Sequence, residues 1–440
     1  MIGKFTKNTF ITFLTQGLIF IISLGISVLL ARILGPEKRG IYSLAMILPS
    51  FLLYFTCFGI GQSSVFYLGE KKYSPKEIFG TNLILVLLIS IFAILIGLII
   101  TFFLNNTLFP GIEKKYLFSA IFLAPCLIFF SFIVSILLGL QNIKKYNLIY
   151  LFNKSLLLFA LIGIFILGIK FEIINIIITE ITVVFISCVV LFFVTKKEAG
   201  GICLKFNKEY FKNSFLYGLK IYLGSIISFL HNRIGILLIN SFLNPLMVGF
   251  YSIGVGLSEK IYLISDSVAT VLFPKVASEN NKLKIKNFTP VIFRNILWII
   301  IIINIIIFII AKWLIIFLYS TSFSASIKPF QILLIGAIAI SGSKILESDI
   351  RGRGKPMLIT WITGISTVLN IILNIILIPK LGILGAAWST SISLIINLIF
   401  TLFIYCKISG NLIKDMFFIK KFDLKLYQNL FIILKNKIKK

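Results

Sequence analysis

Several stretches of this chain each run for more than twenty residues without any Asp, Glu, Lys or Arg. Among them are residues 8–31, 40–69, 78–112, 116–143, 356–379 and 381–406. About 20 consecutive apolar residues cross the hydrocarbon core of a bilayer as an α-helix. Backbone groups in hydrocarbon must be paired within a helix or a closed barrel, and barrel strands would be about 10 residues of alternating polarity, which these stretches are not. The sequence therefore predicts an all-α membrane protein.

Further apolar stretches bring the predicted number of transmembrane helices to about twelve. The predicted spans are residues 9–33, 41–67, 79–104, 117–140, 146–169, 173–195, 214–242, 249–273, 290–318, 327–349, 357–378 and 383–406. Only 13% of the residues are charged, against about 25% in soluble domains, so most of the chain is expected to face lipid. An even number of spans places both termini on one side of the membrane.

Basic residues are distributed unequally between the two sides that these spans define. The side with both termini carries 29 Lys and Arg residues, and the opposite side carries nine. Because basic loops stay in the cytoplasm, both termini are predicted to be cytoplasmic. The net charge of +28 lies in short connections that face anionic lipid headgroups, not on the single basic face of a nucleic-acid binder. We therefore predict anionic membrane lipids as partners and no nucleic acid.

Cysteine and histidine positions indicate neither a metal site nor a cofactor. The five cysteines have no paired or metal-ligand spacing and are interpreted as small packing residues. They are Cys57, Cys126, Cys188, Cys203 and Cys406. The single histidine, His231, has no partner at ligand spacing.

A short motif occurs twice, at the ends of spans one and seven. Leu34–Ser43 reads LGPEKRGIYS and Leu243–Ser252 reads LNPLMVGFYS, so both copies read L-x-P-x-x-x-G-x-Y-S at an offset of 209 residues. Pro stops a helix, and Gly permits a tight turn into the next one. Since six spans separate the copies, the two halves have the same orientation and form a parallel repeat about an axis along the membrane normal.

The repeat predicts four parts of the chain. These are a first six-helix lobe (1–200), a cytoplasmic linker (201–212), a second six-helix lobe (213–407) and a basic cytoplasmic tail (408–440). Two such lobes can rock around a cavity between them, which is the basis of alternating access. For the tail, an amphipathic segment on the inner leaflet and disorder both remain open.

Three motifs, in this order along the chain, resemble those of polysaccharide flippases. Residues 31–42 (ARILGPE, then GIY) resemble the first-loop signature, and GFYS at 249–252 followed by LFPK at 272–275 resembles its second copy. NIILN at 370–374, then IP at 378–379 and GILGAA at 382–387, resembles the eleventh-span and final-loop pattern. Over residues 1–406 the chain is similar to the O-antigen and capsule repeat-unit branch of the multidrug/oligosaccharidyl-lipid/polysaccharide exporter superfamily.

The resemblance implies a V-shaped, MATE-like fold with a cationic central cavity. It also implies that the chain flips an undecaprenyl-pyrophosphate-linked oligosaccharide across the cytoplasmic membrane of a bacterium, beside the polymerase and chain-length proteins of the pathway. A cation-coupled drug antiporter of the same fold is the alternative. That branch uses intramembrane carboxylates, and the first half of this chain has one such candidate, Glu180.

Charged residues at membrane depth are expensive, and they are functional candidates. Arg233 and Lys260 are expected to present positive charge to the pyrophosphate, which a guanidinium fork matches well. Pairing of Arg233 with Glu259 for mutual neutralisation is the other interpretation. Lys154 either faces the cavity or extends to the inner interface. Arg32 either steers the headgroup or caps span one.

Three carboxylates are candidates for binding a coupling proton or sodium ion. They are Glu180, Glu259 and Asp266. A membrane enzyme such as a polysaccharide polymerase would need a large soluble loop for its catalytic residues, and the connections between the predicted spans are short. The sequence thus predicts a transporter without catalytic residues.

Overall fold

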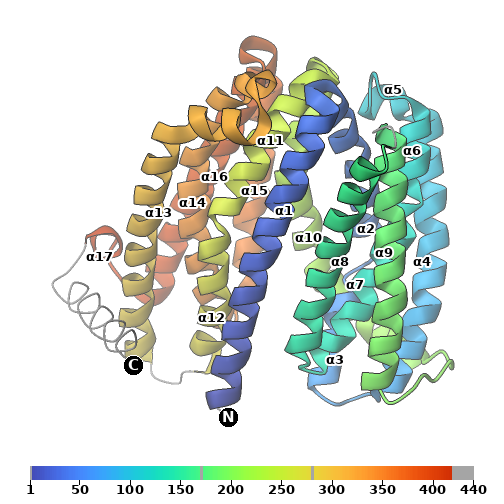
Figure 1. Cartoon of the computed structure of the whole chain (residues 1–440). Coiled ribbons are helices and arrows are strands. Elements are labelled where there is room, and N and C mark those ends of the chain that lie inside the picture. Colours follow the sequence, from blue (N-terminus) through green and yellow to red (C-terminus); the bar gives the residue numbers. More distant parts are fainter. Residues whose placement is uncertain (1, 169–171, 279–281, 419–440) are drawn as a thin grey trace, which may run out of the picture. The chain divides into compact units, whose positions relative to one another are not determined.

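A computed structural model describes residues 2–168, 172–278 and 282–418 of the chain (Figure 1). Within these residues the chain forms helices and turns and no β-strand. The helices are α1 (Ile2–Ala45), α2 (Ile47–Thr56), α3 (Ile60–Gly69), α4 (Pro75–Phe103), α5 (Asn105–Leu108), α6 (Lys114–Ile121), α7 (Leu123–Gly139), α8 (Ile143–Ile166), α9 (Ile173–Glu198), α10 (Lys208–Phe242), α11 (Pro245–Ile261), α12 (Leu263–Ser278), α13 (Lys282–Tyr319), the 3₁₀ helix η1 (Thr321–Ser326), α14 (Ile327–Gly352), α15 (Pro356–Leu381), α16 (Ile383–Ser409) and α17 (Lys414–Phe417). Of the predicted tail, residues 419–440 lie outside the described residues.

The helices confirm an all-α membrane protein of about twelve spans. Ten helical stretches in the described part of the chain are long and apolar enough to cross a membrane. One of them, Leu14–Thr56, contains most of the predicted span one and the first part of the predicted span two. Span eight is divided at Tyr262 into α11 and α12, of 17 and 16 residues.

The first motif copy lies inside the long helix α1, and its turn is not where the sequence suggested. Gly35 has a left-handed φ of 68° and kinks the helix, and Pro36 follows as the first residue of the continuing segment. Pro suits that position because its missing N–H is not needed there. Gly40, which we expected to form the turn, is helical and buried. The expectation that Gly40 turns the chain is therefore wrong.

Side-chain caps begin several of the spans. Ser74 accepts a hydrogen bond from the backbone N–H of Glu77 at 3.3 Å, with Pro75 as the first residue of α4. Asn142, Asn207 and Asn244 accept in the same way at the starts of α8, α10 and α11. Such caps satisfy backbone donors that a helix leaves unpaired, so these starts are encoded locally.

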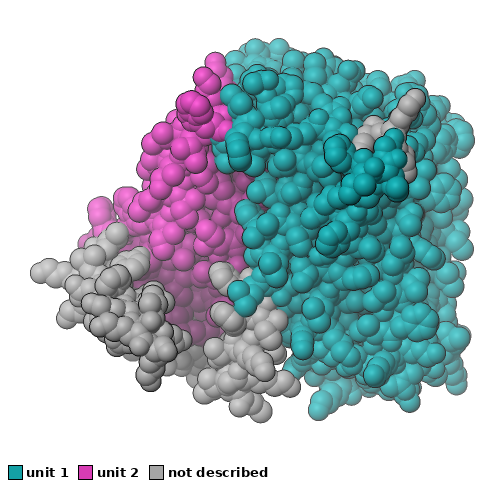
Figure 2. All heavy atoms as spheres, viewed as in Figure 1, with its two compact units in different colours: residues 1–253, 314–326, 374–386 teal, residues 254–313, 327–373, 387–440 magenta. Residues whose placement is uncertain are grey.

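Contacts divide the chain into two compact units, coloured separately in Figure 2. Unit 1 comprises residues 1–253, 314–326 and 374–386; unit 2 comprises residues 254–313, 327–373 and 387–440. Unit 1 thus contains α10, which the predicted lobes assign to the second half. The lobe boundaries stay a prediction.

A buried polar ring within unit 1 holds α10 against α3 and α4. Tyr210 of α10 hydrogen-bonds Ser64 at 2.8 Å and donates to the Oδ1 atom of Asn82 at 3.1 Å, while the Nδ2 atom of Asn82 donates to Ser64 at 3.0 Å. All three side chains are fully buried. Buried polar groups are costly unless they are paired, so this closed ring fixes one register between the helices.

Unit 2 is built around α12, α13 and α14. Its apolar core includes Phe293, Leu346 and Tyr405, all completely buried. Asp349 is also completely buried. It receives hydrogen bonds from Arg353 and, at 2.5 Å, from Thr289.

The predicted linker is docked on α4. The backbone N–H of Cys203 donates to the carbonyl of Lys76 at 3.2 Å, and that of Asn207 donates to Thr81 at 3.2 Å. Gly80 lies beneath this segment, and a Cβ atom added to it would be 1.7 Å from the carbonyl oxygen of Cys203.

Replacing Gly80 by Ala is expected to destabilise the protein by about 2–3 kcal/mol, because a methyl group has no room against a backbone carbonyl. Thermal unfolding in detergent measures the effect. Gly69→Ala is the matched control, since nothing lies within 4 Å of a Cβ atom added there. Equal unfolding temperatures for the two variants would contradict the docking of the linker.

Candidate functional site

Lys154 is a cation at the middle of a membrane span. It is the twelfth residue of the 24-residue helix α8 and is half-buried. It makes no hydrogen bond or ion pair with any other residue that the structure describes. The helix around it is fixed, because Asn147 donates to Thr12 of α1 at 2.8 Å and Asn153 donates to Ser187 of α9 at 3.1 Å. A rigid helix thus presents an unpaired ammonium group at membrane depth.

Glu180 of α9 lies beside the first motif copy. The hydroxyl of Tyr42 donates to its Oε2 atom at 2.6 Å. The guanidinium of Arg39 lies 5.3 Å from the centre of the Tyr42 ring. The Nε and Nη1 atoms of Arg39 are buried and have no hydrogen-bond partner among the described residues. The carboxylate of Glu180 is therefore hydrogen-bonded to Tyr42, whose ring lies in turn beside the guanidinium of Arg39.

In the sequence, Arg39 is one of the nine basic residues on the side predicted to lie opposite the termini, and no further role was predicted for it. A signal was present in the motif itself, because Arg39 and Tyr42 are three residues apart and share one face of a helix. Their common partner Glu180 is 138 residues away from Tyr42, and spacing gives no hint of it.

Arg32 caps a helix, although the helix is not span one. Its Nε atom donates to the carbonyl of Leu318 at 2.7 Å, and its Nη2 atom donates to the carbonyl of Phe317. These carbonyls belong to the last turn of α13, which lacks intrahelical partners and favours a cation. Arg32 thus closes the end of α13 within unit 1, and its role toward a headgroup stays a prediction.

The remaining candidates are divided between the units. Arg233 is a half-buried residue of α10 in unit 1. Glu259 and Lys260 are half-buried residues of α11, and Asp266 is a half-buried residue of α12, all in unit 2. The predicted meeting of Arg233 with Glu259 and Lys260 stays a prediction.

Asp266 has a partner that the sequence interpretation missed. The ammonium group of Lys344 in α14 lies 2.6 Å from each carboxylate oxygen of Asp266 and 4.1 Å from the centre of the Tyr262 ring. Lys344 falls within a predicted span, so its depth alone should have marked it as a candidate. The carboxylate of Asp266 is therefore neutralised inside unit 2.

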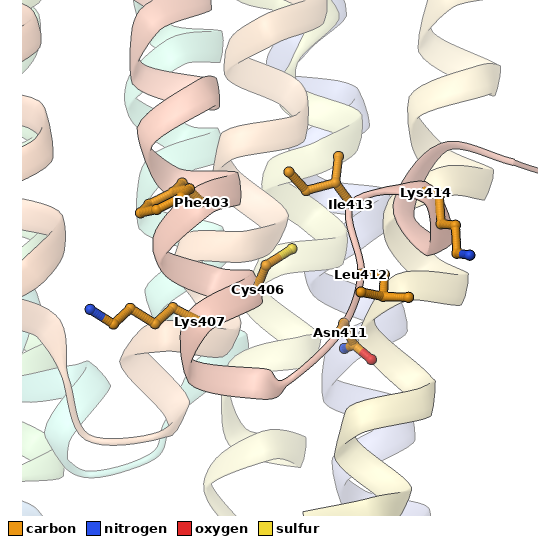
Figure 3. A pocket seen from close by; sticks show the side chains of 7 residues that line it. All are labelled: Phe403, Cys406, Lys407, Asn411, Leu412, Ile413 and Lys414. Atoms are coloured by element: carbon orange, nitrogen blue, oxygen red, sulfur yellow. The ribbon is translucent and has the colours of Figure 1, made fainter.

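An open hollow of about 650 Å³ lies at the end of α16. It is lined by Phe403, Cys406, Lys407, Asn411, Leu412, Ile413 and Lys414 (Figure 3). Its lysine side chains point away from each other in Figure 3, and none of the predicted site residues line it. No cluster of three His, Cys, Asp or Glu side chains that could hold a metal occurs in the described ranges.

Comparisons with known proteins add a family and relatives. The model of the family described as polysaccharide biosynthesis protein matches residues 5–280. Agl15 of Haloferax volcanii, a probable low-salt glycan biosynthesis flippase, is 28% identical over 198 residues, which cover 42% of this chain and 41% of that protein. An uncharacterized membrane protein of Methanocaldococcus jannaschii is 26% identical over 186 residues, covering 41% and 37%. The chain spans about two fifths of the length of these curated relatives.

Solved structures with a similar fold are membrane transporters. The lipid II flippase MurJ in an inward closed conformation has a TM-score of 0.72 at 20% identity, covering 92% of this chain and 88% of that one. An inward-facing multidrug resistance transporter of the MATE family has a TM-score of 0.67 at 14% identity, covering 88% and 94%. These similarities confirm the predicted MATE-like fold.

Proposed function

The chain belongs to the polysaccharide biosynthesis protein family, and we propose that it flips a lipid-linked oligosaccharide between the leaflets of a membrane by alternating access. The observation that carries the proposal is Lys154, a half-buried ammonium at the middle of a span that has no partner among the residues that the structure describes. Such a group needs a counter-charge at membrane depth. A pyrophosphate-linked saccharide supplies that charge while it crosses.

The proposed substrate is an undecaprenyl-pyrophosphate-linked repeat unit of O-antigen or capsule. Lys154, Arg233 and Lys260 would bind the pyrophosphate, with Arg32 near the exit for the headgroup. The proposed setting is the cytoplasmic membrane of a bacterium, with both termini in the cytoplasm and the polymerase and chain-length proteins as downstream partners. Anionic lipids would surround the basic connections.

A proton or sodium ion is the proposed coupling ion, bound by Glu180, Glu259 or Asp266. Tyr42 already orients the carboxylate of Glu180, which favours it as the binding group in unit 1. Asp266 must first separate from Lys344 before it could accept a cation. Glu180 is accordingly the first choice.

A drug or organic-cation antiporter of the same fold is the second candidate. It would need intramembrane carboxylates that are available to a cation. In unit 2 the carboxylate of Asp266 is paired with Lys344, whereas Lys154 in unit 1 carries a positive charge that no described residue pairs with. This balance favours an anionic substrate.

The two functions separate in proteoliposomes that contain the purified protein. The wild type is expected to move a fluorescent undecaprenyl-pyrophosphate saccharide between leaflets at least tenfold faster than the saccharide moves in protein-free liposomes. It is expected not to transport an organic cation such as ethidium. Ethidium movement without saccharide flipping would replace the flippase by the antiporter.

A further inference from the structure

The chain reverses direction at the end of α16, within unit 2. Gly410 directly follows this helix and has a left-handed φ of 68°, the conformation in which glycine commonly ends a helix. We call the next residues, 411–418, the strap. At its start the side-chain amide of Asn411 donates to the backbone carbonyl of Lys286 in α13, at 2.9 Å. The strap therefore lies against α13 and does not continue away from the protein.

Three further contacts fix the strap. The Nη1 atom of Arg294 donates to the carbonyl of Asp415 at 3.2 Å, and the indole N–H of Trp298 donates to the carbonyl of Phe417 at 3.0 Å. The side chain of Met416 is completely buried in the apolar core of unit 2. These partners come later in α13 than the partner of Asn411, so the strap runs from the predicted cytoplasmic end of α13 into its predicted span.

The open hollow of about 650 Å³ lies between the last turns of α16 and the strap (Figure 3). Phe403 and Lys407 line it from one face of α16, because they are four residues apart, and Lys407 is the one nearer the end of the helix. Figure 3 shows Ile413 of the strap at the level of Phe403, and Asn411 at the level of Lys407. The hollow thus has apolar walls toward the membrane interior and polar groups toward the predicted cytoplasmic side.

The exposed side chains around the hollow are apolar or basic. Phe403, Leu412 and Ile413 are each more than half exposed. Lys407 and Lys414 are exposed, and neither side chain makes a hydrogen bond or an ion pair with a residue that the structure describes. Their long side chains can bend toward a headgroup while the stems cover apolar surface. Exposed apolar side chains bordered by lysines are typical of segments that lie in the interface of an anionic leaflet.

We propose that this hollow binds one anionic phospholipid of the cytoplasmic leaflet. The phosphate lies beside the ammonium groups of Lys407 and Lys414, and an acyl chain lies over the apolar walls. A third cation stands close by, because the Nζ atom of Lys286 is 3.4 Å from a Cβ atom added to Gly410. The fixed strap keeps both walls of the hollow in place without the lipid. Binding of this lipid does not depend on what the protein transports.

Lipid retention by the purified protein in detergent tests the charge requirement. Native mass spectrometry with added phosphatidylglycerol or phosphatidylcholine measures the affinity for the first lipid bound. The wild type is expected to bind phosphatidylglycerol at least tenfold more tightly than phosphatidylcholine. Lys407→Gln combined with Lys414→Gln should remove this preference and leave the affinity for phosphatidylcholine unchanged.

Lys212→Gln combined with Lys355→Gln is the matched control, since it removes the same charge from two exposed lysines elsewhere. Its preference for phosphatidylglycerol should stay within twofold of the wild type. An equal loss in the control would show that only total charge matters, and would overturn the proposal. Lower thermal stability of the first double variant with unchanged lipid binding would mean that Lys407 only neutralises the carbonyl end of α16, and would overturn it too.

The native thiol of Cys406 locates the bound lipid, because Cys406 lines the hollow. Added phosphatidylglycerol is expected to slow alkylation of Cys406 by N-ethylmaleimide at least fivefold, whereas phosphatidylcholine should have little effect. Cys203, half-buried in unit 1, is the internal reference for the effect of an anionic micelle on thiols. Peptide mass spectrometry gives both rates. Lys414→Gln should abolish the protection of Cys406, and equal slowing of both cysteines would contradict a site at the hollow.

Two other occupants give different results in the same assay. If Cys406 is protected without added lipid and becomes reactive when residues 419–440 are removed, the chain's own tail fills the hollow. If undecaprenyl phosphate protects Cys406 at lower concentrations than phosphatidylglycerol does, the hollow belongs to the path of a polyprenyl substrate. Either result would overturn the assignment to a phospholipid.

Discussion

Replacing Arg353 by Met is expected to destabilise the protein by about 3–5 kcal/mol, because it leaves a buried carboxylate without its counter-ion. The side chain of Asp349 is 0% exposed and that of Arg353 is 17% exposed. Among the described residues, Asp349 would then keep only the hydrogen bond from the side chain of Thr289, at 2.5 Å. Thermal unfolding of the purified protein in detergent measures the loss.

The exposed pair of Lys115 and Glu113 provides the control. Their charged groups are 2.6 Å apart, and their side chains are 54% and 61% exposed. Exposed pairs contribute about 0–1 kcal/mol, so Lys115→Met should unfold close to the wild type. Combining Asp349→Asn with Arg353→Met should recover part of the stability, because the buried charge is then gone. An Arg353→Met variant as stable as the wild type would contradict the assignment of Arg353 as the counter-ion of the buried Asp349 carboxylate.

Replacing Lys154 by Ala is expected to slow saccharide flipping by about 10–100-fold. Hydrogen bonds to charged groups contribute about 1.5–3 kcal/mol, and each 1.4 kcal/mol corresponds to about a factor of ten. Lys154→Arg keeps the positive charge and should retain most of the activity. The measurement is the proteoliposome assay with the undecaprenyl-pyrophosphate saccharide.

Lys220→Ala is the control for a general loss of positive charge. Lys220 is an exposed lysine of α10 and lies nearer the predicted cytoplasmic end of its span. Its removal should leave flipping within about twofold of the wild type. Equal rates for Lys154→Ala and the wild type, with both proteins folded, would remove Lys154 from the substrate path.

Features of the fold that depend on local chemistry were predictable from the sequence. Apolar length defined the spans, and the side chains of Ser74 and Asn207 cap the helices that follow them directly in the sequence. The depth of Lys154 also follows from its position within a span. Its lack of a partner does not, because that depends on what every neighbouring helix brings to the same place.

Contacts between distant segments escaped prediction for the same reason. Arg32 caps α13 across 286 residues of sequence, and Lys344 reaches Asp266 across 78. The motif glycines show the limit most clearly. Gly40 was read as a turn residue from its neighbours, whereas its partner is the backbone of Pro245. A single sequence shows that a position needs glycine without showing what approaches it.

Within unit 1 the two copies of the repeated motif touch reciprocally, because Gly40 lies against the backbone of Pro245 and Gly249 lies against the backbone of Pro36. A contact in which each copy offers the other the same residues is also the contact of a symmetric homodimer. A protein that paired with itself through this motif would already have made the contact that the two copies make here. Duplication and fusion of its gene would then require only a linker such as the one docked on α4. After fusion, the residues that meet the partner copy stay constrained by it, whereas residues elsewhere need to suit only the fold of their own half.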